Sequence, residues 1–214
     1  VLVVDDNSPD GTGELADRIA AEDRCHLNGL AMEEGQPRYV TAVAQSDVAE
    51  GWRAGRADGG CIIDVPAGKV VVEGLSMPHS PRLWADRLWL LNAGRGEFGH
   101  IDNGRFQPMA RAPGFLRGLA FTGQYAVLGL SRARDEGVFE GLPLGDSLKR
   151  DGRESICALW VIDLERGEMC HELRFEAPIQ ELYDVVFLPG VQHAAALGLE
   201  GEEIHHSITI GRPG

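Results

Sequence analysis

Apolar residues recur at two different spacings along the chain, and the change falls near Asp23. Before it, the apolar run Val1–Val4 predicts a buried β-strand, and apolar positions at helical spacing between residues 15 and 22 predict an α-helix. From about Cys25 onward, short apolar runs are separated by glycine-rich turns, which is typical of β-sheet proteins. We therefore expect a mainly β fold that is preceded by a short β-α segment over residues 1–24.

A repeated hairpin signal organises the β-rich part. Short apolar strands end in an Ile-Asp dipeptide, and a glycine follows within a few residues. Aspartate can accept hydrogen bonds from turn N–H groups and glycine readily adopts positive φ, so each dipeptide predicts a tight β-hairpin without any functional role. The three dipeptides are Ile63-Asp64, Ile101-Asp102 and Ile162-Asp163.

Further strands recur ahead of each hairpin, which gives about four strands per unit. The units begin near His26, His79 and Arg117, and a fourth begins near Gln180. Four-stranded units at this period are typical of propeller blades. We expect a partial β-propeller of about four blades, at 25–76, 77–113, 114–178 and 179–214. Because no segment resembles a closing strand, we expect these blades to be the C-terminal part of a larger propeller.

The composition restricts the range of partners. The chain has 214 residues and a net charge of −13, which argues against binding to nucleic acid or to an anionic membrane. No apolar run is long enough to span a bilayer, so we expect a soluble, cytoplasmic protein. The four cysteines, Cys25, Cys61, Cys157 and Cys170, form no C-x-x-C motif and are expected to be buried free thiols.

Polar residues at the blade starts provide the candidate site. The innermost strand of each blade lines the central channel of a propeller, so these residues should converge there. Imidazole, carboxylate and amide groups could bind a divalent metal, whereas arginines would repel a cation and suit an anionic small molecule. The alternative is that these side chains only bond to the backbone of neighbouring blades. The candidates are His26, Asn28, His79, Ser80, Arg82, Arg117, Glu181 and Asp184.

Other notable residues are expected to be structural. Trp84, Trp89 and Trp160 lie on apolar strands and are predicted to belong to the core. The charged loop 131–154 is predicted to be a solvated insertion, and His205-His206 a solvated edge.

Two resemblances add to this interpretation. The segments CHLNGLA (25–31), PRYVTA (37–42), GLSMPHSPR (74–82), GFLRGLAF (114–121) and ALWVIDLERGE (158–168) resemble a family of conserved hypothetical bacterial proteins with a domain of unknown function. That resemblance covers about residues 24–200 and implies a propeller-like fold. The opening VVDDNSPDGTGELADRIAAED resembles polyprenyl- or dolichyl-phosphate mannosyltransferases, which implies that Asp5 and Asp6 help to hold a nucleotide.

Three functions remain open at this stage. The chain is expected to be a propeller-type module that binds a small molecule or acts as a scaffold, with an anionic small molecule or a protein as its partner and no catalysis of its own. The first alternative is a nucleotide-sugar-dependent mannosyltransferase that uses Asp5 and Asp6. The second is a metal-dependent lyase or hydrolase with its site in the propeller channel. No cofactor is assigned.

Overall fold

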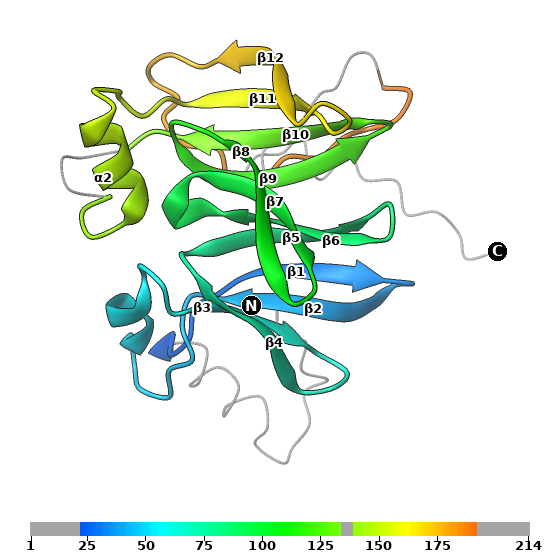
Figure 1. Cartoon of the computed structure of the whole chain (residues 1–214), viewed down its shortest axis with the longest axis vertical. Coiled ribbons are helices and arrows are strands. Elements are labelled where there is room, and N and C mark those ends of the chain that lie inside the picture. Colours follow the sequence, from blue (N-terminus) through cyan, green and yellow to red (C-terminus); the bar gives the residue numbers. More distant parts are fainter. Residues whose placement is uncertain (1–21, 134–138, 192–214) are drawn as a thin grey trace, which may run out of the picture.

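Three four-stranded antiparallel sheets make up most of the structure (Figure 1). The computed structural model describes residues 22–133 and 139–191. The first sheet contains β1 (Leu27–Glu33), β2 (Gln36–Ala42), β3 (Gly60–Asp64) and β4 (Lys69–Leu75). The second contains β5 (Pro78–Trp84), β6 (Arg87–Asn92), β7 (Glu97–Asp102) and β8 (Arg105–Arg111). The third contains β9 (Phe115–Thr122), β10 (Tyr125–Ser131), β11 (Ala158–Asp163) and β12 (Glu168–Arg174).

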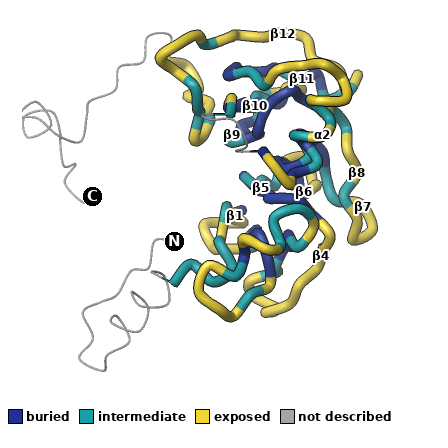
Figure 2. The backbone as a smooth tube through the Cα atoms, turned by 90° about the vertical axis from the view of Figure 1, so that its left-hand side faces the viewer, coloured by how far each residue is buried: buried dark blue, intermediate teal, exposed yellow. Residues whose placement is uncertain are grey.

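The sheets are arranged as in propeller blades. In each sheet the strands are hydrogen-bonded in the order in which they occur in the chain. The first strands of successive sheets are in contact, β1 with β5 and β5 with β9. Figure 2 shows these inner strands on one side of the molecule and β4, β8 and β12 towards its outside. The prediction of a mainly β, propeller-like fold is thereby confirmed, and the described sheets do not close into a ring.

The Ile-Asp dipeptides mark the last hairpin of each sheet. Asp64, Asp102 and Asp163 end β3, β7 and β11. Asp163 Oδ1 accepts the backbone N–H of Glu165 at 2.9 Å, which is the turn contact expected from the sequence. In the shortest of these three hairpins Asn103 and Gly104 both have positive φ, 48° and 71°, the backbone of a two-residue turn with the correct twist.

The ends of the chain are only partly described. The described part of the fourth predicted unit, residues 179–191, contains no strand. Most of the β-α segment, including Asp5 and Asp6, and the pair His205-His206 lie outside the described residues.

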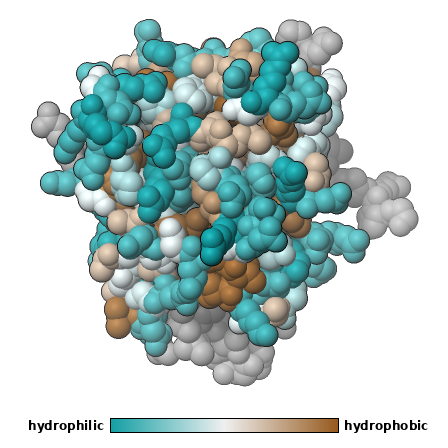
Figure 3. All heavy atoms as spheres, viewed as in Figure 1, coloured by the Kyte–Doolittle hydropathy of each residue, from teal (hydrophilic) through white to brown (hydrophobic). Residues whose placement is uncertain are grey.

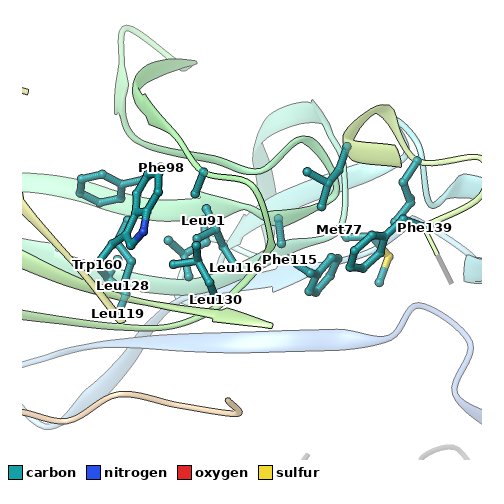
Figure 4. Packing of buried hydrophobic residues seen from close by; sticks show 14 of the residues in the cluster. Met77, Leu91, Phe98, Phe115, Leu116, Leu119, Leu128, Leu130, Phe139 and Trp160 are labelled. Carbon is teal, nitrogen blue, oxygen red and sulfur yellow. The ribbon is translucent and has the colours of Figure 1, made fainter. Parts of the chain in front are cut away.

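The main hydrophobic core lies between the second and third sheets (Figure 4). Phe98 of β7 and Leu116, Leu128 and Leu130 of the third sheet are fully buried there. Trp89 and Trp160 belong to this core, as predicted. The prediction is wrong for Trp84, which is 36% exposed and stacks on Phe121 with 5.4 Å between ring centroids.

The insertion between β10 and β11 contributes to that core. It contains the helix α2 (Pro143–Arg150), and its side chains Phe139, Leu142 and Leu144 are each less than 10% exposed. The expectation of a solvated insertion is therefore wrong for the described part of this loop. Its charged residues face solvent while its apolar ones belong to the core of the second and third sheets, so the segment packs against one side of these sheets.

The four cysteines are free, but they are not all buried. Cys61 and Cys157 are buried, Cys25 is partly exposed and Cys170 on β12 is exposed. The exposed position follows from the location of Cys170, because every residue of β12, the outer strand of its sheet, is exposed.

Apolar side chains also reach the surface of the first sheet. Figure 3 shows an apolar area over the region of β4, where Val70 and Val71 are 37% and 40% exposed. Among residues 22–133 and 139–191, no helix combines the length and the apolar character that crossing a membrane requires.

Candidate ligand site at the inner strands

A cavity of about 150 Å³ lies where the inner strands meet the two loop insertions. Two of its walls are contributed by the 3₁₀ helix η1 (Gly51–Gly55) with the residue that follows it, and by the insertion before α2. Three aromatic rings and three arginines surround one carboxylate. The lining residues are Trp52, Arg56, Met77, Phe115, Arg117, Ser131, Arg132, Phe139, Leu142 and Glu181.

Arg117 of β9 is the central charged group of this cavity. Its guanidinium lies 5.4 Å from the ring centroid of Phe115 and 5.5 Å from that of Tyr183. Its Nη1 is 4.0 Å from Glu181 Oε2, which is at the limit of an ion pair. Its Nε atom is buried and has no hydrogen-bond partner among the described residues. Arg117 is therefore held in place by aromatic contacts, and part of its donor capacity remains unused.

His79 of β5 lies next to Arg117. The pKa of His79 is lowered to about 3, first because burial disfavours the charged ring and then because Arg117 and His26 repel the added proton. The ring packs edge-on against Phe115 at 5.4 Å between centroids. His79 is therefore neutral at pH 7, and its Nε2 atom is buried without a hydrogen-bond partner in the described chain.

His26 and Asn28 complete this group from the first sheet. His26 Nδ1 is 2.7 Å from Asp23 Oδ2, and the His26 ring stacks on Trp52 with 4.4 Å between centroids. Asn28 of β1 forms a hydrogen bond with His79 through its backbone, while its side-chain Nδ2 is buried and unpartnered within the described residues. Residues predicted from three different blade starts thus lie close together.

Ser80 has a structural role between the inner strands. Its Oγ accepts the backbone N–H of Gly118 at 3.1 Å, which ties β5 to β9. Gly29 of β1 approaches the same place so closely that a Cβ atom there would lie 2.4 Å from Pro81 Cδ. Ser80 thus helps to fix the distance between the blades and does not line the cavity.

Arg82 and Asp184 are separate from the cavity. They form an ion pair at 3.3 Å and line a larger groove of about 540 Å³ together with Trp84 and Phe121. Of the eight predicted residues, two therefore line the cavity, three lie beside it at the starts of the first two sheets, one links two strands, and two lie elsewhere.

Several cavity residues were missed by the sequence interpretation. Trp52 and Arg56 lie in the connection between β2 and β3, and Arg132 and Phe139 lie in the insertion after β10. None occupies a repeated position, so alignment of the blades could not reveal them. The one available signal was the segment Gly51-Trp52-Arg53-Ala54-Gly55-Arg56, in which one tryptophan lies close to two arginines. That combination is unusual for a turn.

The donor set favours anions over cations. Three arginines with one carboxylate form an electropositive site in a chain whose net charge is −13. Arginine offers a planar set of N–H donors that matches carboxylate oxygens. Among the described residues, no group of three or more His, Cys, Asp or Glu side chains is placed to hold a metal ion.

Comparisons with known proteins identify a family and several solved structures of similar fold. No curated protein matches the sequence. Among solved structures, the computationally designed protein Ika8 is similar at 15% identity and a TM-score of 0.42, covering 76% of this chain and 40% of its own. The β-propeller domain of Cps50 (Swd1) from Myceliophteria thermophila is similar at 12% identity and a TM-score of 0.39, covering 86% of this chain and 50% of its own. The chain spans at most about half the length of these two structures.

Residues 12–197 match the family described as Domain of unknown function (DUF4915). This range contains all three sheets and every residue that lines the cavity. It begins within residues 1–24, ahead of the first sheet. Because the match extends over most of the sequence, the chain belongs to the DUF4915 family.

Proposed function

We propose that the protein is a binding module for a small organic anion, which occupies the cavity beside Arg117. The observation that carries this proposal is the buried Nε of Arg117, which lacks a partner among the described residues. A buried N–H group without a partner is costly, and an anionic oxygen is the acceptor that a guanidinium binds most strongly.

The surroundings of Arg117 support the same ligand class. Arg56 and Arg132 add positive charge to the cavity wall, while Trp52, Phe115 and Phe139 provide apolar contact surface. A few polar groups in an aromatic pocket are typical of small-molecule sites. The cavity volume of about 150 Å³ is below the usual range for drug-sized ligands, so the anion is small.

Calorimetric titration with a series of two- to six-carbon carboxylates tests the proposal. We expect at least one of them to bind with a dissociation constant below about 1 mM, and Arg117→Met to weaken it at least tenfold. Arg105→Met is the matched control, because Arg105 is exposed at the start of the outer strand β8 and does not line the cavity. If no carboxylate binds, or if both variants bind equally well, the proposal fails.

A scaffolding role without a small ligand makes a different prediction. In that case the cavity arginines would only position the loops, as Arg56 does when its Nη2 donates to the carbonyl of Glu140. Arg117→Met would then lower the thermal stability, but no carboxylate would raise the melting temperature of the wild type.

The resemblance of residues 1–24 to mannosyltransferases supports a separate proposal, a nucleotide-sugar site at Asp5 and Asp6. Calorimetry with a GDP-sugar is the test, and binding that disappears in Asp6→Ala would support the transferase. For a metal-dependent lyase or hydrolase in the channel, we expect bound metal in elemental analysis that is lost in His79→Ala.

A further inference from the structure

The positive charge of the cavity is divided among several of its walls. Arg117 comes from β9, Arg56 from the connection between β2 and β3, and Arg132 from the position directly after β10. Glu181 is the one carboxylate among the described lining residues, and its Oε2 lies 4.0 Å from Nη1 of Arg117. Because one carboxylate balances only one of three guanidinium groups, the described lining has an excess of two positive charges.

Arg56 is held at the wall that the insertion after β10 provides. Its Nη2 donates to the carbonyl oxygen of Glu140, and a Cβ atom added to Gly141 would lie 3.8 Å from the same nitrogen. Phe139 and Leu142, which flank these two residues in the chain, line the cavity. A carbonyl group is neutral, so this hydrogen bond fixes the guanidinium group of Arg56 without balancing its charge.

Two aromatic rings lie between Arg56 and Arg117. The guanidinium group of Arg117 is 5.4 Å from the ring centroid of Phe115, and that ring stacks on Phe139 with 6.0 Å between centroids. Phe139 in turn precedes Glu140, whose carbonyl oxygen holds Arg56. Figure 4 shows the rings of Phe115 and Phe139 side by side. The cavity therefore has one guanidinium group at each end of an apolar stretch.

This arrangement selects among small anions. A monocarboxylate binds one guanidinium group and leaves the charge at the other end unbalanced. A phosphate monoester has two charges, but both are on one group. A linear dicarboxylate offers a planar acceptor to each guanidinium group, and its methylene groups suit the two rings between them.

We propose that the ligand is a short linear dicarboxylate, with one carboxylate group at Arg117, the other at Arg56, and its methylene chain against Phe115 and Phe139. This inference rests on the proposed function, because it takes the anion site at Arg117 as its starting point. Arg132 adds to the positive charge that favours a second carboxylate group. The cavity of about 150 Å³ limits the length of the chain, so succinate is the first probe.

Three ligands with one carbon skeleton test the need for a second charge. Calorimetric titration of the wild type compares succinate, succinamate and butyrate. Succinamate replaces one carboxylate group by an amide of nearly the same shape, and butyrate replaces it by a methyl group. We expect succinate to bind at least about tenfold more tightly than either of the others. If succinamate binds as tightly as succinate, the second group needs no charge and the inference is wrong.

Methyl phosphate tests whether the two charges must be separated. At pH 7.5 it carries close to two negative charges on a single group. We expect it to bind at least about threefold less tightly than succinate, because one compact group cannot lie at both Arg56 and Arg117. Binding of methyl phosphate as tight as that of succinate would indicate a site for a compact dianion and would overturn the inference.

Variants at Arg56 locate the second carboxylate group. Arg56→Gln removes the charge and keeps an amide donor, so the ratio of the succinamate to the succinate dissociation constant should fall to within about threefold of one. Arg56→Lys keeps the charge and should keep the preference for succinate. Arg105→Gln is the matched control, since Arg105 is exposed on β8 and does not line the cavity. A tenfold preference that survives in Arg56→Gln would place the second carboxylate group elsewhere and would contradict the inference.

The outcomes distinguish the inference from the function on which it rests. Equal, Arg117-dependent binding of butyrate, succinamate and succinate would refute the dicarboxylate and leave the anion site intact. Failure of every carboxylate to bind would refute both. Circular dichroism confirms that each variant is folded, and the comparison of ligands on the wild type decides the question even if Arg56→Gln does not fold.

Discussion

His79 combines burial with two positively charged or chargeable neighbours, Arg117 and His26. Each of these features disfavours a second proton on the ring. The carboxylate of Asp23 bonds to His26 rather than to His79. At the residue scale, the fold thus keeps the His79 ring neutral, and this makes the free energy of unfolding depend on pH.

The free energy of unfolding should fall as the pH is lowered from about 6.5 towards 3. In the unfolded chain His79 takes up a proton near its ordinary pKa of 6.5, whereas in the folded protein it does so only near 3. The contribution of the neutral His79 ring to the free energy of unfolding is therefore complete above pH 6.5 and is lost as the pH falls from 6.5 towards 3. Between pH 7.5 and 5 this amounts to about 2 kcal/mol. Urea unfolding at both pH values measures it.

His79→Gln supplies the reference for that measurement, because glutamine does not titrate. Other groups titrate in both proteins, so the quantity to compare is the change in stability of the wild type minus that of the variant. An identical pH dependence of the two proteins would show that the folded and unfolded pKa values of His79 do not differ.

At the scale of elements, the contact between β5 and β9 includes a hydrogen bond to one buried hydroxyl group. Ser80 is 8% exposed, and its Oγ is the acceptor for the N–H of Gly118. Ser80→Ala leaves that N–H without its acceptor, so we expect a loss of about 1–2 kcal/mol in the free energy of unfolding. Ser147→Ala is the control, because the hydrogen bonds of Ser147 in α2 are exposed. Its effect should stay below about 0.5 kcal/mol. Equal effects in urea unfolding would contradict the role of Ser80.

The helix α2 is expected to fold together with the sheets. Leu144 is 2% exposed and belongs to the main core. Leu144→Ala should therefore cost about 2–4 kcal/mol by leaving a cavity, whereas Lys149→Ala on the exposed side of α2 should cost less than about 0.5 kcal/mol. Chemical denaturation of both variants provides the comparison. A small effect of Leu144→Ala would mean that the insertion is only loosely attached.

The hairpin turns and the inner-strand positions could be predicted from the sequence, whereas the walls of the cavity could not. The hairpins at Asp64, Asp102 and Asp163 are determined by local turn chemistry, so they were predictable. The convergence of His79 and Arg117 followed from the repeat, because equivalent positions on inner strands are adjacent. The cavity walls at Trp52 and Phe139 come from irregular insertions, whose positions depend on tertiary packing that no periodicity records.

Residues 179–191, the described part of the fourth predicted unit, also show that a strand cannot be predicted from a local segment alone. The run Val185-Val186-Phe187-Leu188 is apolar and resembles a strand, yet it forms none. Preceding residues instead bond to the end of β10, where Ser131 Oγ donates to the carbonyl of Leu182 at 3.1 Å. A strand requires a partner strand with a free edge, and that requirement cannot be read from one segment alone.

At the scale of the whole molecule, the apolar core is distributed unequally among the sheets. The second and third sheets share the large cluster around Phe98, Leu116 and Leu128. The strands of the first sheet contribute mainly to a small second cluster, in which Ile62, Val72 and Leu75 pack on Leu90. Regions with less buried apolar contact open at lower free energy than the global unfolding reaction.

We therefore expect the first sheet to open before the other two. In native-state hydrogen exchange followed by mass spectrometry, amides of β2 and β3 should show opening free energies at least about 1–2 kcal/mol below those of β10 and β11. Ile62→Val, which weakens the small cluster, should lower the values in β2 and β3 and also those in β10, because the first sheet is lost in global unfolding as well. Leu128→Val should lower the values in β10 and β11 and leave those in β2 and β3 unchanged, because the main core stays packed when only the first sheet opens. Exchange at the same opening free energy in β3 and β10 would show instead that the three sheets unfold as one cooperative unit.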